Sequence, residues 1–589
     1  MQNSMLNNKS VEPKDSVKAI EPYEVPLFAE EYKLKLDSNE NIFGCSNKVY
    51  EALRNLSSEQ ISRYPHYGIL TEKISEYISI PSEYIKVTNG ADEALFALIQ
   101  TYLSEKDAMI TVTPSFSMPK LYANIIGASV IEVPYKKRWE FPINEFISEI
   151  KNNPKIKIVH ITSPNNPTGE CLPPEYAEKI ISVSQDKLVI FDETYASYCK
   201  QSMIPKVKEY DNIAVVKSFS KDFALAGLRI GYIITEPKRI KVLKTVVSPY
   251  SVNIAATIAA EAALCDLEHL EKIKTEIRKS KEILSLGLQK LGFEVYPSEA
   301  NFVLFDAGKK AEYVYHTLLK NGIKVRKFSV EQMQGLIRIT APDCDNSEMI
   351  LSLLQPKKTL IFDMDGVLVD VSNSYRTTIK KTYEHFSGKN LDYEEITKAK
   401  NLGGLNNDWD LTEYLLKKDG INVDKKQIID IFEKIYFDDG KGLINKEQFL
   451  FDKELIKELS QKYNLCIFTG RPKTEADYTL ETNGVKEYFY PIITMDDLPK
   501  DKQKPDKYGI EVIKEKVMST EIYYFGDTKD DMVCGKSAQI KTIGVLAPQH
   551  QSEEMKKHLT DNGADYVLTS INELLTVTER ELNANINQK

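Results

Sequence analysis

Lys221 is a residue whose type and surroundings suggest covalent chemistry. It stands in SFSKDFALAGLR, directly after the apolar run IAVV (213–216), and the carboxyl end of such a strand faces the ligand crevice of a parallel sheet. A lysine there can form a Schiff base if burial and nearby charge lower its pKa. Two hydroxyl groups and a cation that suit one phosphate group come from Ser218, Ser220 and Arg229. Taken alone, these residues fit an ordinary surface turn followed by a helical arginine equally well.

Other polar residues follow neighbouring predicted strands. Asp192 comes directly after KLVIF (187–191) and could pair with the pyridine nitrogen of a cofactor, so that the protonated ring acts as an electron sink. A helix that begins directly after a strand, at NGADE (89–93), offers free backbone N–H groups to an anion. The remaining expected members of this site are Gly90, Ala91 and Asp92 at that helix start, Phe116 in TPSFSM, Asn166 in SPNNPTG and Tyr195 in DETY. Singly, Asp192 could be a satisfied core aspartate and Phe116 a core aromatic, so the ordered set carries the argument.

The order NGADE, PSF, PNNPTG, DETY and SFSK-x7-R resembles the aminotransferases of fold type I, which depend on pyridoxal 5′-phosphate (PLP). The flanking segments KLDSNENIFG (35–44), RYP (63–65), PSEANFVLF (297–305) and GIKVR (322–326) look most like the histidinol-phosphate aminotransferase family, over about residues 20–354.

This resemblance implies roles for individual residues. Lys221 would hold PLP and carry the proton, with glutamate as the amino donor. Tyr64 would reach the cofactor of the partner subunit, which implies a homodimer. The residues implied at the anionic end of a small phosphorylated substrate are Arg326 and Arg338, with Tyr23 and Asn39 nearby.

Departures from the family pattern concern the substrate end. Ile42 and Cys45 stand where the family often has prolines, Lys327 replaces a common acidic residue, and APDCDNSEM (341–349) is unusual. Transamination is therefore better supported than the identity of the amino acceptor.

A second set of acidic residues follows an independent set of predicted strands. Asp363 and Asp365, in FDMDG after TLIF (359–362), can converge on one metal ion. Oxygen ligands suit Mg²⁺, a carboxylate can attack phosphorus, and a lysine and a threonine can steady charge on a transferring phosphoryl group. We expect Asp363 to be the nucleophile and Asp365 the acid and base. Thr469 in FTGRP and Lys504 in QKPDKY are the expected substrate contacts. The expected Mg²⁺ ligands are Asp363, Asp365 and Asp527, and Asp531 lies in the same GDTKDDM segment as Asp527.

The ordered set DxDG, TG, KP and GDxxxD resembles the haloacid dehalogenase (HAD) superfamily, over about residues 356–578. An acid at position 365 matches its phosphatase branches. The mostly helical stretch 374–450 looks like the α-helical cap that closes over the site and selects substrates in that superfamily. Trp409 is expected to pack the cap helices, and contact with substrate is the alternative.

The elements that must position these residues predict two α/β units. In the first, runs that are apolar on both faces alternate with helical stretches, which is typical of a parallel sheet covered on each side. A long helical region at 254–291 then leads to a smaller α+β subdomain. The second unit is a Rossmann-like α/β domain with the helical cap. The predicted boundaries are a flexible lead-in at 1–20, the aminotransferase unit at 21–355, the HAD-like unit at 356–578 with its cap at about 374–450, and a tail at 579–589.

Composition excludes several other classes of protein. A net charge of −9 argues against nucleic-acid binding, and no apolar run approaches the ~20 residues that span a bilayer. The N-terminus lacks the apolar stretch of a secretory signal. Seven scattered cysteines predict reduced thiols in a cytoplasmic enzyme, and the scattered histidines argue against a zinc site.

The two chemistries complement each other, because an amino-alcohol phosphate made by the first could lose its phosphate to the second. We therefore expect imidazole acetol phosphate and glutamate to give L-histidinol phosphate and then L-histidinol. One alternative is the same pair of reactions on another keto- or amino-alcohol phosphate. Another is an aminotransferase whose C-terminal unit has no turnover. A PLP-binding transcription factor is remote, since no DNA-binding segment is evident.

Overall fold

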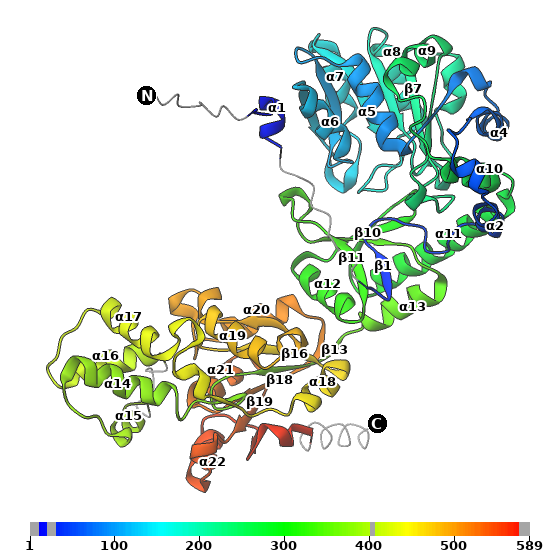
Figure 1. Cartoon of the computed structure of the whole chain (residues 1–589). Helices are drawn as coiled ribbons and strands as arrows, with labels where there is room; N and C mark the ends of the chain where they lie inside the picture. The colour runs from blue at the N-terminus through cyan, green and yellow to red at the C-terminus, as the bar shows by residue number, and fades with distance from the viewer. Residues whose placement is uncertain (1–10, 21–30, 401–406, 576–589) are drawn as a thin grey trace, which may run out of the picture. The chain divides into compact units, whose positions relative to one another are not determined.

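The computed structural model describes residues 11–20, 31–400 and 407–575. These residues form two compact units that divide at Leu353 and Leu354, except that residues 312–316 belong with the second unit. Each unit has its own sheets (Figure 1). Tyr23 and the expected tail at 579–589 lie outside the described residues. No helix in the described ranges is both long and apolar enough to cross a membrane.

Part of the expected lead-in forms a short helix. Helix α1 (Asp15–Lys18) lies against α6 (Met118–Ile126), and the Ser16 hydroxyl donates to the carbonyl of Ile125 at 3.0 Å. This segment therefore contacts the first unit through both a polar side chain and a helical turn.

The first unit contains a seven-stranded sheet in the order β2-β8-β7-β6-β5-β3-β4. Its strands are β2 (Ile85–Thr88), β3 (Ala108–Thr113), β4 (Ser129–Pro134), β5 (Ile156–Thr162), β6 (Leu188–Asp192), β7 (Ile213–Ser218) and β8 (Gly231–Thr235). The pairs from β4 through β7 are parallel, as predicted, whereas β8 runs antiparallel to both β7 and β2. Strand β8 was not among the predicted strands.

Helices cover both faces of this sheet, which explains why its strands are apolar on both sides. Val189 and Phe191 of β6 belong to one buried core, and Ile190 between them belongs to another. The first core includes residues of α2 (Asn47–Arg54), α4 (Gly68–Ile78), α7 (Ile143–Asn152), α8 (Pro174–Val183) and α10 (Ile254–Leu264), and the second includes residues of α5 (Gly90–Tyr102), α6 and α9 (Pro237–Val246).

A smaller α+β region completes the first unit, as predicted. Its five-stranded sheet has the order β1-β11-β12-β10-β9. The expected long helical region is two helices, α10 and α11 (Leu267–Lys290), and α11 packs against α13 (Cys344–Leu353). The other elements are β1 (Leu34–Leu36), β9 (Glu294–Tyr296), β10 (Phe302–Asp306), α12 (Ala311–Lys320), β11 (Ile323–Lys327) and β12 (Leu336–Thr340).

The second unit is built on a parallel six-stranded sheet in the order β17-β16-β13-β18-β19-β20. Its strands are β13 (Lys357–Phe362), β16 (Asn464–Phe468), β17 (Phe489–Ile493), β18 (Ser519–Gly526), β19 (Lys541–Val545) and β20 (Tyr566–Leu568). The connecting helices are α18 (Lys453–Lys462), α19 (Lys473–Thr482), α20 (Tyr508–Lys516), α21 (Lys529–Ser537) and α22 (Glu553–Asp561).

A helical cap is inserted between β13 and β16. The chain leaves the sheet region through β14 (Val369–Asp370) and returns through β15 (Gln448–Phe449), and these two short strands pair antiparallel. Between them lie α14 (Tyr375–Ser387), α15 (Tyr393–Lys400), α16 (Asp408–Lys418) and α17 (Lys425–Tyr436). The Trp409 ring packs on the buried core and its Nε1 donates to Glu433 at 3.2 Å, so the packing role expected of this residue is confirmed.

Candidate active sites

Lys221 lies in the loop that follows β7, at the carboxyl end of the strand. Its Nζ donates to the backbone carbonyl of Ser38 at 2.9 Å. Desolvation by the surrounding chain, together with the positive charge of Arg338, lowers the pKa of Lys221 to about 8. Only a neutral amine can attack a carbonyl carbon, so this environment favours the covalent role predicted for the residue.

The reaction of Lys221 with a small aldehyde is expected to depend on pH. For the cofactor-free protein, the rate should rise with pH to a midpoint near 8 and then level off, because deprotonation exposes the attacking lone pair. Arg338→Met should move the midpoint to higher pH, since it removes a charge that disfavours the ammonium form. Reductive methylation with formaldehyde, followed peptide by peptide by mass spectrometry, measures both. An unchanged midpoint in Arg338→Met would contradict the assigned electrostatic cause.

Asp192 ends β6 beside the strand that leads to Lys221. Its side chain is buried, and its Oδ1 accepts hydrogen bonds from the backbone N–H (3.1 Å) and hydroxyl (2.7 Å) of Thr194. Burial raises the pKa of Asp192 to about 6. A buried carboxyl group that accepts from the neutral donors of Thr194 suits a protonated ring nitrogen, which would supply a positive charge.

Hydrogen bonds join two residues predicted to bind substrate, Asn39 and Arg338, to two predicted to bind the cofactor, Tyr195 and Asn166. Asn39 Nδ2 donates to the Tyr195 hydroxyl at 3.0 Å, and Arg338 Nη1 donates to Asn166 Oδ1 at 2.5 Å. Arg338 Nη2 also donates to the carbonyl of Asp37 at 2.6 Å. These bonds bring the loops after β1, β5 and β6 to strand β12 of the smaller sheet. The structure therefore places all four predicted residues in one region.

An anion cradle forms at the start of α5. Its N-cap residue Asn89 makes no side-chain cap, which leaves the first N–H groups of the helix for another acceptor. Arg229 follows the β7 loop, and its Nη2 pairs with Asp92 at 2.8 Å. Gly90 has a φ of +77°, and a Cβ there would lie 2.8 Å from Nη2 of Arg229. The absence of a side chain at Gly90 therefore leaves room for the guanidinium. The cradle has the charge and donor groups that a phosphate requires.

Nearby on the β7 side, the Ser218 hydroxyl accepts a hydrogen bond from the backbone N–H of Ser220 at 3.1 Å, so both serines lie at the strand end as predicted.

Three other predicted residues have fewer contacts that tie them to the site. Arg326 lies opposite Arg338 in the antiparallel register of β11 and β12, but it is exposed whereas Arg338 is buried. Phe116 is partly buried against the second core of the large sheet. Tyr64 is 72% exposed and stacks on Tyr250, with ring centroids 4.4 Å apart, so it is on the surface of this chain.

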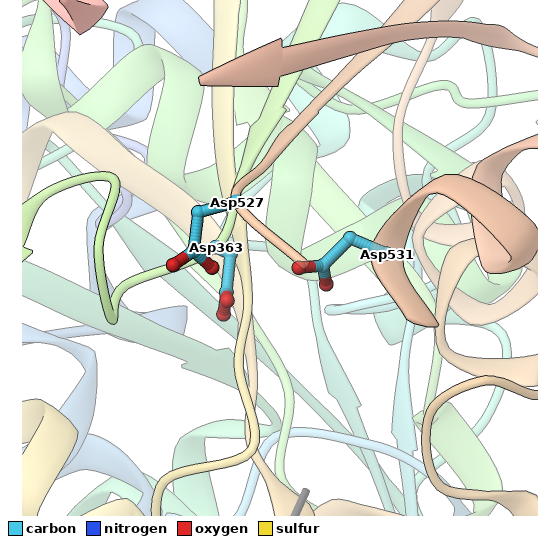
Figure 2. A group of neighbouring side chains, drawn as sticks. All are labelled: Asp363, Asp527 and Asp531. Atoms are coloured by element: carbon cyan, nitrogen blue, oxygen red, sulfur yellow. The ribbon is translucent and has the colours of Figure 1, made fainter. Parts of the chain in front are cut away.

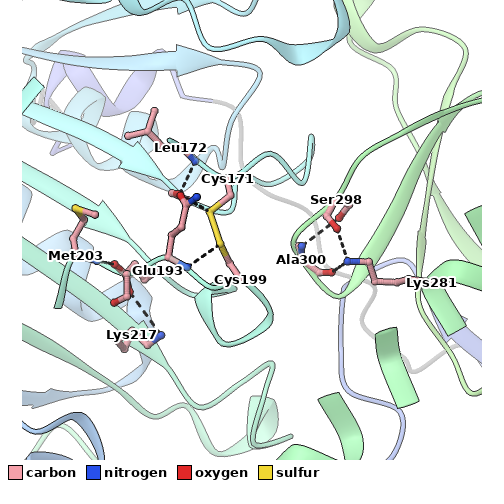
Figure 3. Close-up of a disulfide and its surroundings, with 12 residues drawn as sticks. Cys171, Leu172, Glu193, Cys199, Met203, Lys217, Lys281, Ser298 and Ala300 are labelled. Atoms are coloured by element: carbon pink, nitrogen blue, oxygen red, sulfur yellow. Dashed lines mark hydrogen bonds and ion pairs between the residues drawn. A yellow bond between two sulfur atoms is a disulfide. The ribbon is translucent and has the colours of Figure 1, made fainter. Parts of the chain in front are cut away.

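The expectation that the cysteines are reduced thiols is wrong for two of them. A disulfide joins Cys171 and Cys199 (Figure 3). It links the loop after β5, which contains Asn166, to the loop after β6, which contains Tyr195. The pairing could not be predicted from the sequence because 28 positions separate the two residues and only folding brings the loops together. The cysteines outside this disulfide are Cys45, Cys265, Cys344, Cys466 and Cys534.

Three carboxylates converge at the sheet edge of the second unit. Oxygen atoms of Asp363, Asp527 and Asp531 lie within 4.8 Å of one another, and Figure 2 shows the three side chains turned toward a common point. Asp363 follows β13 and Asp527 follows the adjacent β18, so the parallel register brings both to one edge. Asp531 lies four residues after Asp527, in the first turn of α21. The carboxylate of Asp365, which was also predicted as an Mg²⁺ ligand, lies outside this cluster of described residues.

Lys504 lies between two of these carboxylates. Its Nζ is 2.8 Å from Asp363 Oδ1 and 2.7 Å from Asp531 Oδ1. Burial raises the pKa of Asp363. Burial acts to raise the pKa of Asp531, but the charge of Lys504 outweighs it and lowers that pKa. Burial acts to lower the pKa of Lys504, but the two carboxylates outweigh it and raise that pKa. Lys504 is thus held as a cation directly beside the predicted nucleophile.

Asp527 supplies the observation that tests whether a cation fits. Burial, followed by repulsion from Asp531, raises the pKa of Asp527 well above its usual range. Its Oδ1 is buried and has no hydrogen-bond partner among the described residues. A buried carboxylate oxygen without a donor is costly, and a divalent cation among three carboxylates would remove that cost. The residues present therefore fit Mg²⁺.

The absence of a side chain at Gly366 leaves room for the Asp527 carboxylate. Replacing Gly366 is therefore expected to weaken metal binding. The residue has a φ of +75°, and an added Cβ would collide with Oδ2 of Asp527. Gly366→Ala should therefore lower the affinity for Mg²⁺ by about 10–100-fold, the usual effect of displacing a group that orients a ligand. Calorimetric titration measures this affinity.

Gly388→Ala is the matched control. Gly388 has a φ of +65° in the same unit, but an added Cβ would meet nothing within 4 Å. This variant carries the same backbone strain of about 1 kcal/mol without the collision. If both variants lose Mg²⁺ affinity equally, backbone strain rather than the position of Asp527 is the cause.

Thr469 and Asp365 have their own partners at this edge. Thr469 is buried one position beyond β16, and its hydroxyl accepts from the backbone N–H of Arg471 at 3.2 Å. Asp365 Oδ1 accepts from Arg471 Nε at 2.6 Å. Arg471 lies in the FTGRP segment but was not among the predicted site residues. A cation two residues beyond a predicted phosphate contact is the signal that could have identified it.

Comparisons with known proteins agree with this division into two sites. Residues 31–351 match the family model described as aminotransferase class I and II, and residues 360–545 match that described as haloacid dehalogenase-like hydrolase. A curated relative, the histidinol-phosphate aminotransferase of Thermoanaerobacter pseudethanolicus, is 33% identical over 347 residues, which are 58% of this chain and 97% of that protein.

Solved structures show the same fold for the first unit. The histidinol-phosphate aminotransferase of Clostridium acetobutylicum is 25% identical with a TM-score of 0.51, and the match covers 55% of this chain and 98% of that one. The histidinol-phosphate aminotransferase of Sinorhizobium meliloti, solved in complex with pyridoxal-5′-phosphate, is 21% identical with a TM-score of 0.53 over 59% of this chain and 97% of that one. At this identity the second likeness concerns the fold.

Proposed function

The chain belongs to the aminotransferase class I and II family and also carries a haloacid dehalogenase-like hydrolase domain, and from this premise we propose that it performs two consecutive reactions on one phosphorylated substrate. The first is transamination of imidazole acetol phosphate by glutamate to L-histidinol phosphate. The second is hydrolysis of that ester to L-histidinol and phosphate. The observation that supports the first substrate is the match to histidinol-phosphate aminotransferases over nearly their whole length.

PLP is the cofactor of the first family, and when bound it supplies an electron sink for the substrate's Cα. The residues of this chain that would hold it are Asp192 at the ring nitrogen, Asn166 and Tyr195 at the ring oxygen, Phe116 at the ring face, and Gly90, Ala91, Asp92, Ser218, Ser220 and Arg229 around the phosphate, with Tyr64 contributed to the partner subunit. Lys221 would carry the proton between the substrate's Cα and the C4′ atom of the cofactor. Its lowered pKa favours this role.

The substrate's anionic end would lie between cationic side chains. Arg338 is buried and already fixed by Asn166 and the carbonyl of Asp37, so little entropy is lost when it grips a phosphate. Arg326, on the neighbouring strand, and Asn39, beside Tyr195, would complete this end of the site. Tyr23 is proposed here from the family resemblance alone.

In the second unit, Asp363 would attack phosphorus while Lys504 and Thr469 steady the charge on the phosphoryl oxygens. Asp365 would give a proton to the departing alkoxide and then accept one from water. Mg²⁺, typical of phosphatases in this superfamily, neutralises charge on the phosphoryl group. It would be held by Asp363 and Asp527, with Asp531 and Asp365 as the further acidic groups of the site.

Product analysis tests the assignment. Wild type is incubated with imidazole acetol phosphate, glutamate and Mg²⁺, and 2-oxoglutarate, L-histidinol phosphate, L-histidinol and phosphate are followed together. A 1:1 mixture of Lys221→Ala and Asp363→Asn should restore the whole conversion if the product of one site is the substrate of the other. The substrate assignment fails if wild type leaves L-histidinol phosphate intact while it cleaves other phosphate esters.

We also propose that the protein forms a homodimer through its aminotransferase unit. Tyr64 and Tyr250 stack on each other although they are exposed by 72 and 48%, so they form an exposed aromatic pair that a partner subunit could cover. Light scattering with size-exclusion chromatography measures the mass, and one 67.1 kDa chain per particle would contradict the proposal. The expected cytoplasmic location stays a prediction that cell fractionation can test.

A further inference from the structure

Arg471 is a buried cation at the edge of the phosphatase site. Its side chain is 0% exposed, and Nε donates to Asp365 Oδ1 at 2.6 Å. The two other nitrogens donate to both carboxylate oxygens of Glu447, at 3.0 and 3.1 Å. Nη1 also donates to the Thr479 hydroxyl at 3.0 Å, and the guanidinium lies 5.2 Å from the centre of the Tyr375 ring.

This set of contacts is too costly to be incidental. A guanidinium loses several kcal/mol of hydration when it is fully buried, and only well-placed opposite charges recover that loss. Arg471 has two carboxylates in fixed directions, one through Nε and one through the forked end of the guanidinium. Its position is therefore determined from two sides, and so is the position of the Asp365 oxygen that it holds.

The second carboxylate belongs to the base of the cap. Glu447 directly precedes β15, the strand by which the chain returns from the cap, and its side chain is 4% exposed. Its Oε1 also accepts from the Ser374 hydroxyl at 2.7 Å and from the Tyr436 hydroxyl at 2.9 Å. Ser374 directly precedes the first cap helix, α14, and Tyr436 is the last residue of the last one, α17. Glu447 thus joins both ends of the cap to Arg471.

We propose that Arg471 is a positioning residue that orients the Asp365 carboxyl for proton transfer, and that Glu447 makes this orientation depend on the arrangement of the cap. The proposal rests on the proposed role of Asp365 as proton donor. In the step concerned, a bond forms between an Asp363 oxygen and phosphorus, the bond from phosphorus to the ester oxygen breaks, and the proton of Asp365 passes to that departing oxygen. With Oδ1 held by Arg471, the direction in which Oδ2 faces is fixed as well.

The leaving group of the substrate distinguishes this role from a merely structural one. An alkoxide leaves poorly without a proton, whereas p-nitrophenolate leaves readily without one. Arg471→Lys should therefore lower kcat/KM about 100-fold for an alkyl phosphate such as L-histidinol phosphate, but less than about 5-fold for p-nitrophenyl phosphate. The value of kcat/KM is used because it reports the steps up to phosphoryl transfer and excludes the later attack of water.

Asp365→Asn shows whether the proposed function itself holds. It should discriminate between the two substrates at least as strongly as Arg471→Lys does. If Asp365→Asn lowers both substrates equally, the proton-donor role of Asp365 fails. If Asp365→Asn discriminates but Arg471→Lys lowers both equally, or neither, the role of Arg471 is overturned while the proposed function stands.

Two further variants keep the test valid if Arg471→Lys folds poorly. Glu447→Gln keeps the size of the side chain but weakens its hydrogen bonds with the guanidinium. It should lower kcat/KM for the alkyl phosphate about 10-fold more than for p-nitrophenyl phosphate. Thr479→Val removes one hydrogen bond to Arg471 far from Asp365, and it should leave both substrates within about 2-fold of wild type. Equal losses on both substrates in Glu447→Gln would contradict the coupling to the cap.

Discussion

Replacing Lys221 with alanine is expected to lower the rate of transamination by about 10⁴-fold or more. The variant loses both the amine that would bind the cofactor covalently and the base that would move the substrate's proton. Lys217, the nearest buried lysine along the chain, pairs with Glu193 at 3.9 Å and is therefore not expected to replace Lys221. The absorbance change on adding glutamate to the PLP-loaded protein, together with the amount of 2-oxoglutarate, measures the effect.

Two controls accompany this variant. Lys241→Ala removes an exposed lysine of α9 and should leave transamination unchanged. Phosphate release by Lys221→Ala should equal that of wild type, because the phosphatase residues belong to the other compact unit. Transamination that falls by less than about 10-fold would show that another group moves the proton.

Asp363→Asn is expected to lower phosphate release by about 10⁴-fold or more, with transamination unchanged. An amide cannot form the phosphorylated intermediate that a carboxylate forms, and it is a weak ligand for Mg²⁺. Release of phosphate from p-nitrophenyl phosphate in the presence of Mg²⁺ measures the loss. This experiment also decides whether the second unit turns over at all, since a unit without turnover would release no phosphate in wild type either.

The same variant should not be less stable than wild type when both are free of metal. Asp363 is buried beside Asp527 and Asp531, and burial of its charge raises its pKa. A neutral side chain of equal size removes part of that repulsion, although it also weakens the pair with Lys504. Denaturant unfolding measures the balance. Asp430→Asn, on an exposed position of α17, is the matched control for both activity and stability.

Much of both sites could be predicted because the relevant residues directly follow apolar strands. Lys221 and Asp192 come just after runs that read as buried parallel strands, and the carboxyl ends of such strands meet at one edge of a sheet. Asp363 and Asp527 follow β13 and β18 for the same reason. Strand patterns are local, so a sequence without any structure already places these side chains near each other.

Consecutive residues are therefore enough to predict the reaction types and the main residues at each strand end. The long-range partners become visible only in the folded chain: Arg471 between Asp365 and Glu447, Asp531 in the carboxylate cluster, the antiparallel strand β8, and the disulfide between Cys171 and Cys199. The physical reason is that these pairings depend on how distant loops and side chains pack. No fixed spacing along the chain encodes such packing, whereas strand alternation and motif spacing are written in consecutive residues.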